Sequence, residues 1–283
     1  MVRELLSRGF DVRVLVRDPS SLMARELREL GAALIRGDMN EPASLRKAMR
    51  GVHGVFSVQP VSKSDFGLEV RQGVRVIDAA KREGVAHMVY SSVGGAERAS
   101  GVAHFESKWR IEEHLRMQGV PCTVLRPVSF MENFRALLRP KSVDGELVLR
   151  MALRPETRFQ LIAIRDIAVF AAEAFERPNA FLNRSIELAG DAPTMLELAS
   201  AFQRVTGVPT RFESLPISQL RIVNMEVAKM FEWLEQESHS ADIPALRRLH
   251  PGLMTLDDWL QEFVVEVAAP VSRPQPIVRL LKW

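Results

Sequence analysis

Two side chains able to take part in proton transfer stand four residues apart in the segment "HFESK". They are the imidazole of His104 and the ammonium of Lys108. Residues at i and i+4 lie on one face of a helix, so a helix would bring the two groups together. An imidazole with an ordinary pKa of about 6.5 suits a general acid, and an ammonium can donate to ligand hydroxyls. Ser91 and Ser92 end an apolar run shortly before them, and Tyr90, the chain's one tyrosine, lies inside that run.

Polar residues also end the other apolar runs of the first half. Arg17, Asp38, and Ser57 with Gln59 hold these positions. The carboxyl ends of parallel strands meet at one edge of a sheet, where dinucleotides bind, so we expect these residues to contact a cofactor. An arginine after the second strand accommodates the 2′-phosphate of NADP, where an acidic residue would select NAD. The ordinary alternatives stay open: a solvated arginine, a turn or helix-capping aspartate, and a polar start to a loop.

Strand and helix patterns alternate through the first half of the chain. This alternation predicts βαβ units and a parallel sheet covered by helices on both faces. The fold class is therefore α/β, with a Rossmann-like doubly wound sheet. The predicted strands are 11–16, 33–38, 54–59, 87–92 and 122–127, and the predicted helices are 2–8, 21–30, 41–51, 69–84 and 106–119.

The second half predicts a smaller, mixed α+β C-terminal domain. Thr194 and Glu197 form a capping-box pattern at the start of one helix. The predicted strands are 146–151, 158–164, 185–190 and 210–216, and the predicted helices are 165–178, 194–207, 218–239 and 255–267. The domain boundaries that we expect are 1–135 plus 160–190 for a dinucleotide-binding domain, 136–159 plus 191–268 for a substrate or partner domain, and 269–283 for a proline-rich, disordered tail.

The chain begins with a helix that ends at Gly9 and leads directly into a strand. In a doubly wound dinucleotide fold, a first strand and a glycine-rich turn come before that helix. Losing about five buried apolar residues, at about 1.5–3 kcal/mol each, would rival the whole stability of a domain. We therefore expect either a start assigned too late or a segment such as 277–281 ("IVRLL") in the strand's place.

Several segments, in this order, resemble the NmrA-like family, an atypical branch of the extended short-chain dehydrogenase/reductases. The full family pattern would also hold a strand and a G-x-x-G-x-x-G turn before residue 2, which this sequence does not contain. The matching segments are "RELLSRGFDVRVLVRDP", "IRGDMNEPASLRKAMRGVHGVFSV", "GVAHMVYSSVGGAERASGVAHFESKWRIEEHLR", "GVPCTVLRPVSFMENF", "RDIA" and "PGLMTLDDWL".

The resemblance implies roles for individual residues. Lys108 matches the reductase lysine that holds the nicotinamide ribose, and Ser91 or Ser92 matches the serine. His104 stands where these reductases have their catalytic tyrosine. The segment "RPVSFMENF" implies a substrate or partner pocket, lined by Phe130, Asn133 and Phe134, although packing between domains is an equal alternative.

Three functions are open on this basis. The first is an NADP-preferring redox sensor or regulator with a protein partner, with NAD as a possible cofactor. The second is an NAD(P)H-dependent oxidoreductase for a quinone-like or small carbonyl substrate, which needs no tyrosine if the acceptor takes hydride directly. The third is a truncated remnant that binds no cofactor, since the missing turn would present N–H groups to the pyrophosphate.

Composition argues against other classes of function. The net charge is +3 with a pI near 9.3, but no basic run is interleaved with aromatic residues, so we expect no nucleic-acid binding. No apolar run reaches the ~18 residues of a membrane span, and no signal peptide is evident, which predicts a cytoplasmic protein. Cys122 predicts a small core residue, and the histidines show no metal-ligand spacing. Glu112 and Glu113 are expected on a solvated helix face.

Overall fold

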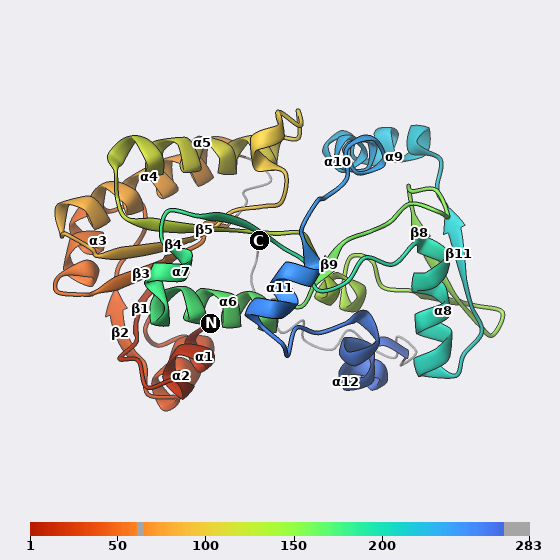
Figure 1. Ribbon diagram of the computed structural model, residues 1–283, viewed down its shortest axis with the longest axis horizontal. Coiled ribbons are helices and arrows are strands. Elements are labelled where there is room, and N and C mark those ends of the chain that lie inside the picture. The colour runs from red at the N-terminus through yellow and green to blue at the C-terminus, as the bar shows by residue number, and fades with distance from the viewer. Residues whose placement is uncertain (61–64, 269–283) are drawn as a thin grey trace.

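The computed structural model describes residues 1–60 and 65–268 and forms two lobes of α/β structure side by side (Figure 1). The first lobe has the alternation of strands and helices that the sequence predicts. Its elements are α1 Val2–Ser7, β1 Arg13–Val16, α2 Leu22–Glu29, β2 Ala33–Arg36, α3 Pro42–Met49, β3 Gly54–Ser57, α4 Phe66–Arg82, β4 His87–Ser91, the 3₁₀ turn η1 Ala96–Arg98, α5 Ala103–Gln118 and β5 Cys122–Pro127.

All strand pairs of this lobe are parallel, but they form two separate sheets. β10 (Ser185–Leu188) joins a four-stranded sheet in the order β10-β5-β4-β3, whereas β1 pairs with β2 alone. Within residues 1–60 and 65–268, β1 and β3 pair with no strand on their other edges. Burial marks the same break, because every residue of β4 is buried while Leu15, Val55 and Phe56 stay half-buried. The sheet is thus interrupted where the first strand of a doubly wound fold would lie.

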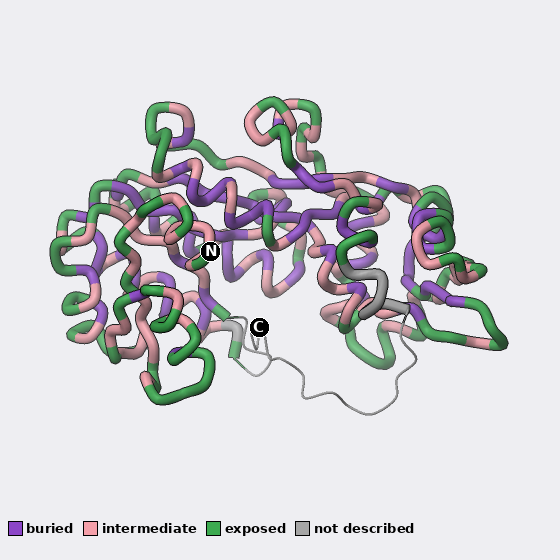
Figure 2. Tube along the Cα trace, turned by 90° about the horizontal axis from the view of Figure 1, so that it is seen from below, coloured by how far each residue is buried: buried purple, intermediate pink, exposed green. Residues whose placement is uncertain are grey.

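Helices cover both faces of the four-stranded sheet. α4 and α5 lie over one face and α6 (Ile164–Glu176) under the other (Figure 1). Ile77 and Ile111 are fully buried on the α4–α5 side, and Phe170 is fully buried on the α6 side. The view from below shows buried chain along the strands and exposed chain at the rim (Figure 2).

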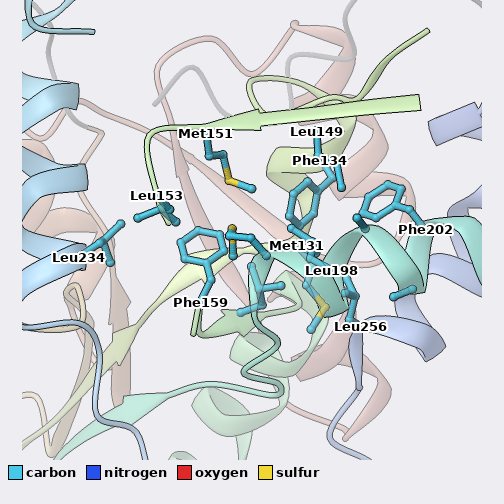
Figure 3. Close-up of a cluster of buried hydrophobic side chains, with 14 of the residues drawn as sticks. Met131, Phe134, Leu149, Met151, Leu153, Phe159, Leu198, Phe202, Leu234 and Leu256 are labelled. Carbon is cyan, nitrogen blue, oxygen red and sulfur yellow. The ribbon is translucent and has the colours of Figure 1, made fainter. Parts of the chain in front are cut away.

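The second lobe surrounds an apolar core that contains Met131, Phe134 and Phe202 (Figure 3). Its strands form a three-stranded mixed sheet, β11-β8-β7, and a short parallel pair, β6-β9. Its elements are β6 Ser129–Phe130, η2 Met131–Arg135, β7 Lys141–Val143, β8 Glu146–Met151, β9 Leu161–Ile162, α8 Met195–Thr206, β11 Thr210–Ser214, α9 Ile217–Val223, α10 Met225–Gln236 and α12 Leu256–Ala268. Two further helices, α7 Pro178–Phe181 and α11 Ile243–Leu249, place Phe181 and Leu246 in the core on the α6 side of the first sheet.

Two helix predictions for this lobe had different outcomes. The capping box of Thr194 and Glu197 is present at the start of α8 and confirms the prediction. The single helix predicted over 218–239 is wrong, because it is two helices. Asn224 is extended between them, and its side chain accepts from the backbone N–H of Val227, which caps α10.

A buried carboxylate ties the C-terminal helices to α6. Asp166 is fully buried in the first turn of α6 and accepts from the backbone N–H of Met254 at 3.0 Å. Its other oxygen lies 3.2 Å from Nε2 of His250. The expected disordered tail at 269–283, with its "IVRLL" segment, lies outside the described residues. No helix among those described is long and apolar enough to cross a bilayer.

We expect the two open strand edges to accept an added strand. An extension before residue 1 of five apolar residues and a glycine-rich turn should raise the melting temperature by at least about 5 °C, because it would cover the half-buried side chains of β1 and β3. Thermal unfolding followed by circular dichroism measures this effect. A glycine–serine extension of equal length is the control, and equal melting temperatures for both would contradict the expectation.

Candidate functional site

The two residues with proton-transfer chemistry share the first turns of α5. This helix begins at Ala103, earlier than the predicted 106, so His104 and Lys108 are one turn apart on the same helix. The backbone N–H of Ala103 donates to the carboxylate of Glu226 on α10, at 3.1 Å. The second lobe therefore helps to hold the end of α5 that contains the candidate site.

Lys108 is buried in an ion pair that sequence reasoning missed. Its ammonium lies 2.7 Å from Oε1 of Glu69, and Ser107 Oγ donates to Oε2 of the same carboxylate at 2.5 Å. Glu69 is fully buried. Glu69 lies in the first turn of α4. Asp65 caps this helix, which therefore begins before residue 69, where the sequence predicted its start. An acidic residue on the buried stripe of an amphipathic helix was the signal that could have identified Glu69.

His104 is neutral in this setting. Burial, together with the neighbouring charge of Lys108, lowers the pKa of His104 to about 4, although the carboxylates of Glu69 and Glu226 act in the opposite direction. At neutral pH the ring is uncharged and is not poised to release a proton as a general acid. A role as a general acid, which the ordinary pKa of histidine suggested, therefore does not suit His104.

Tyr90 lies inside β4 and does not replace the tyrosine of the reductases. It is fully buried, and its hydroxyl has no hydrogen-bond partner in the described part of the chain. Burial raises its pKa well above the usual value, and the carboxylates of Glu69 and Glu112 act in the same direction. The Lys108 ammonium lies 5.9 Å from the centre of the Tyr90 ring, so the two residues interact through the ring face.

The candidate cofactor contacts lie at or just after the carboxyl ends of β1, β2, β3 and β4. Arg17 is exposed, and Asp38 Oδ1 accepts from both the backbone and the side chain of Asn40, which supports its turn role. Gln59 is fully buried and donates to Ser57 Oγ at 2.8 Å.

The amide of Gln59 presents a buried acceptor at this edge. Gln59 Oε1 has no hydrogen-bond partner among the residues described, so it is an acceptor that a ligand hydroxyl could satisfy. Ser91, at the end of β4, is also buried. These donors and acceptors fit a ribose-containing ligand.

Glu112 corrects a prediction. It was expected on a solvated helix face, but it lies fully buried on the inner face of α5. Its carboxylate accepts from Ser92 Oγ at 2.6 Å and from two nitrogens of Arg126, and it pairs with Arg116 at 2.8 Å. A buried carboxylate requires hydrogen-bonding and charged partners such as these. The pattern of residue types along the sequence does not show which partners it will have.

A second arginine joins the loop after β4 to the other lobe. Arg98 donates to the carbonyl of Ser238 at 2.7 Å and to Glu187 at 2.9 Å, and its guanidinium lies 5.1 Å from the centre of the Trp233 ring. Gly95 makes the approach possible, because a Cβ there would lie 2.4 Å from the Trp233 ring. The strand end that contains Ser91 is thus coupled to α10.

The three residues predicted to line a pocket have different environments. Phe130 is half-buried in β6, and the Asn133 side-chain amide reaches Ser129 Oγ at 3.4 Å. Phe134 is fully buried, and its ring packs edge-on against Phe202 with centroids 5.3 Å apart (Figure 3). Phe134 therefore has the packing role that the sequence allowed as an alternative.

The described residues offer no cluster of three metal-ligating side chains. Cys122 is half-buried at the start of β5, and burial raises the pKa of its thiol, which keeps it protonated at neutral pH. The site is therefore built from hydroxyl, amide and ion-pair chemistry.

Comparison with known proteins agrees with this geometry. A model of the NmrA-like family matches residues 1–260. The chain belongs to the NmrA-like family. Among its relatives, an NAD(P)H azoreductase from Xenophilus azovorans is 30% identical over 224 residues, which cover 78% of this chain and 74% of the relative.

Solved structures show the same fold. The negative transcriptional regulator NmrA in complex with NAD has a TM-score of 0.79 at 20% identity, covering 94% of this chain and 91% of that one. The NADPH-dependent quinone oxidoreductase QOR2 from Escherichia coli, in complex with NADPH, has a TM-score of 0.77 at 22% identity, covering 93% and 95%. Both likenesses establish the Rossmann-like α/β fold of this NmrA-like protein.

The buried and exposed glutamates of α5 should differ sharply in their effect on stability. Glu112→Gln removes the fully buried counter-charge of Arg126, which keeps only the more exposed Glu97 at 2.7 Å, and should cost about 3 kcal/mol of unfolding free energy. Glu113→Gln, one residue along on the exposed face, should change it by less than about 0.5 kcal/mol. Urea denaturation measures both, and a small cost for Glu112→Gln would contradict its assigned role.

His104 should make stability depend on pH. Its pKa is about 4 when folded and about 6.5 when unfolded, so the unfolded chain binds more protons between these values. Stability therefore rises with pH through this window and is lost as pH falls. His104→Gln should flatten the slope of unfolding free energy between pH 4.5 and 6.5, whereas His53→Gln, on the surface, should not. Identical slopes in all three proteins would show that His104 keeps an ordinary pKa.

Proposed function

We propose that this NmrA-like protein binds NADP(H) and passes the redox state of the cofactor to a protein partner. The family fold and the residues at the strand ends support a dinucleotide ligand. Arg17 would meet the 2′-phosphate, Gln59 and Lys108 the nicotinamide ribose, and Asp38 the adenine. The bound nicotinamide would supply hydride chemistry.

The observation that supports binding without proton transfer is the pair of groups on α5. His104 has a pKa of about 4, and Glu69 compensates the charge of Lys108. Neither group is suited to give a proton to a carbonyl substrate at neutral pH. Both can still hold a ligand, since a neutral imidazole and an ammonium each donate hydrogen bonds. A sensor needs no more than this.

The contacts between α5 and the second lobe support a route for the signal. Glu226 holds the N-terminal end of α5, and Arg98 joins the loop after β4 to Trp233. A ligand that moves Lys108 or Ser91 would strain contacts to α10. We assign the partner surface to this second lobe.

The alternative is an NAD(P)H-dependent oxidoreductase acting on a quinone-like or small carbonyl substrate. Its support is the relatives, which include the azoreductase at 30% identity. Hydride transfer to a quinone can proceed without the tyrosine. Steady NADPH oxidation with a panel of quinones would favour this function, and NADPH-dependent capture of a protein with no turnover would favour the sensor.

Calorimetry of NADPH binding is the decisive experiment. The 283-residue chain is compared with a chain extended before residue 1 by a strand and a glycine-rich turn. Binding by either chain supports the dinucleotide function, and binding by the extended chain alone identifies the glycine-rich turn as the missing phosphate contact. If neither chain binds NADPH, the remaining hypothesis is a remnant that binds no cofactor.

Arg17 should set the preference for NADPH. Removing its guanidinium in Arg17→Ala should weaken NADPH binding about 10- to 100-fold, the loss of one or two charge-assisted hydrogen bonds, and NADH binding less than about threefold. Titration calorimetry on whichever chain binds measures the ratio. Arg25→Ala, an exposed arginine on α2, is the control. Equal loss for both cofactors would contradict a contact to the 2′-phosphate.

A further inference from the structure

Glu69 of α4 takes no part in the residue roles that the family resemblance implies, yet it pairs directly with Lys108. Both of its carboxylate oxygens are used, one by Lys108 at 2.7 Å and one by Ser107 at 2.5 Å. No part of the side chain is exposed, and Lys108 is itself 7% exposed. This is a closed, desolvated ion pair between two helices.

We infer that Glu69 is the positioning residue for Lys108, which it aims at the ligand and balances in charge. The inference rests on the proposed function, because Lys108 matters as the contact to the cofactor ribose. It adds a residue from a different helix to the site. It also explains why an acidic side chain lies in the core.

The spacing on α4 brings Glu69 to Lys108. Glu69, Gly73 and Ile77 follow one another at intervals of four and share the helix face that meets α5. A Cβ at Gly73 would lie 2.6 Å from Cδ1 of Ile111, so the missing side chain lets the two helices approach closely. This close approach puts the short Glu69 side chain within reach of the ammonium.

The pair leaves the ammonium usable. An ammonium has three donors, and Glu69 takes one of them, so others can meet ribose hydroxyls. Because Glu69 already compensates its charge, Lys108 would contribute hydrogen bonds to the cofactor. The charge would otherwise be buried alone, and an unpaired buried lysine loses its proton readily.

The other titratable groups around Lys108 do not replace this carboxylate. His104 on the same helix is neutral at neutral pH, and Tyr90 on β4 presents its ring face. Glu226 of α10 acts on His104 and pairs with Lys229. Glu112, further along α5, pairs with Arg116 and Arg126. Removing the charge of Glu69 should therefore make Lys108 titrate at lower pH.

The test compares wild type with Glu69→Gln in the full chain. NADPH affinity is measured by calorimetry from pH 6 to pH 10, and the Lys108 side chain is titrated by heteronuclear NMR without cofactor. In Glu69→Gln the Lys108 ammonium would be buried without a carboxylate partner, which favours its uncharged form as the pH rises. NADPH binding should then weaken about tenfold between pH 7 and pH 9, against less than about twofold in wild type.

A matched control separates positioning from simple stabilisation. Asp78 of α4 also pairs with a residue of α5, His114, at 2.8 Å, but on the more exposed side. Asp78→Asn removes a link between the same helices and should leave the pH profile of binding and the Lys108 titration unchanged. A purely structural Glu69 would give the same result in both variants.

The outcomes are distinct. Unchanged Lys108 titration and pH-independent binding in Glu69→Gln overturn the inference. If Glu69→Gln fails to fold, Glu69→Asp keeps the charge on a shorter side chain and should show weaker binding at all pH values with the wild-type titration of Lys108. Wild-type affinity in Glu69→Asp would also overturn it. If neither the chain nor its extended form binds NADPH, the proposed function fails, and the NMR titration still decides the role of Glu69.

Discussion

The coverage of the parallel sheet by two helical layers is the constraint on which the rest of the molecule depends. β4 is buried along its whole length, with α4 and α5 on one side and α6 on the other. A charged group in these layers needs a protein partner, because water does not reach it. The buried carboxylates Glu69, Glu112 and Asp166 follow this rule, and each joins two or more elements.

Carboxylates also join the two lobes. Asp166 connects α6 to the loop before α12, and Glu226 caps the end of α5 from the second lobe. The loop after β4 is held by Arg98 against Trp233. The carboxyl edge of the sheet is therefore connected to α10 by a hydrogen bond and by side-chain packing. Such a connection would suit a protein whose bound ligand changes its affinity for a partner.

The replacement of a tyrosine by His104 changes the chemistry that the site can perform. A phenol beside an uncompensated lysine can exchange a proton near neutral pH. In this site burial keeps the imidazole neutral, and Glu69 balances the lysine. The described site therefore holds hydrogen-bonding groups and an ion pair but no poised acid.

Local patterns in the sequence determined the element order, the parallel sheet and the family. Apolar periodicity and capping residues act within a few positions, so β5 and the capping box of α8 were predicted at their observed residues. The interruption between β1 and β3 among the described residues was also predictable, because no strand pattern precedes α1 in the sequence. Only the tertiary structure decided the states of Glu69, Glu112 and His104. Glu69 pairs with Lys108, 39 residues away along the chain, and Glu112 pairs with Arg126, 14 residues away. The pKa of His104 depends on its burial and on the carboxylates of Glu69 and Glu226. No local period encodes such contacts.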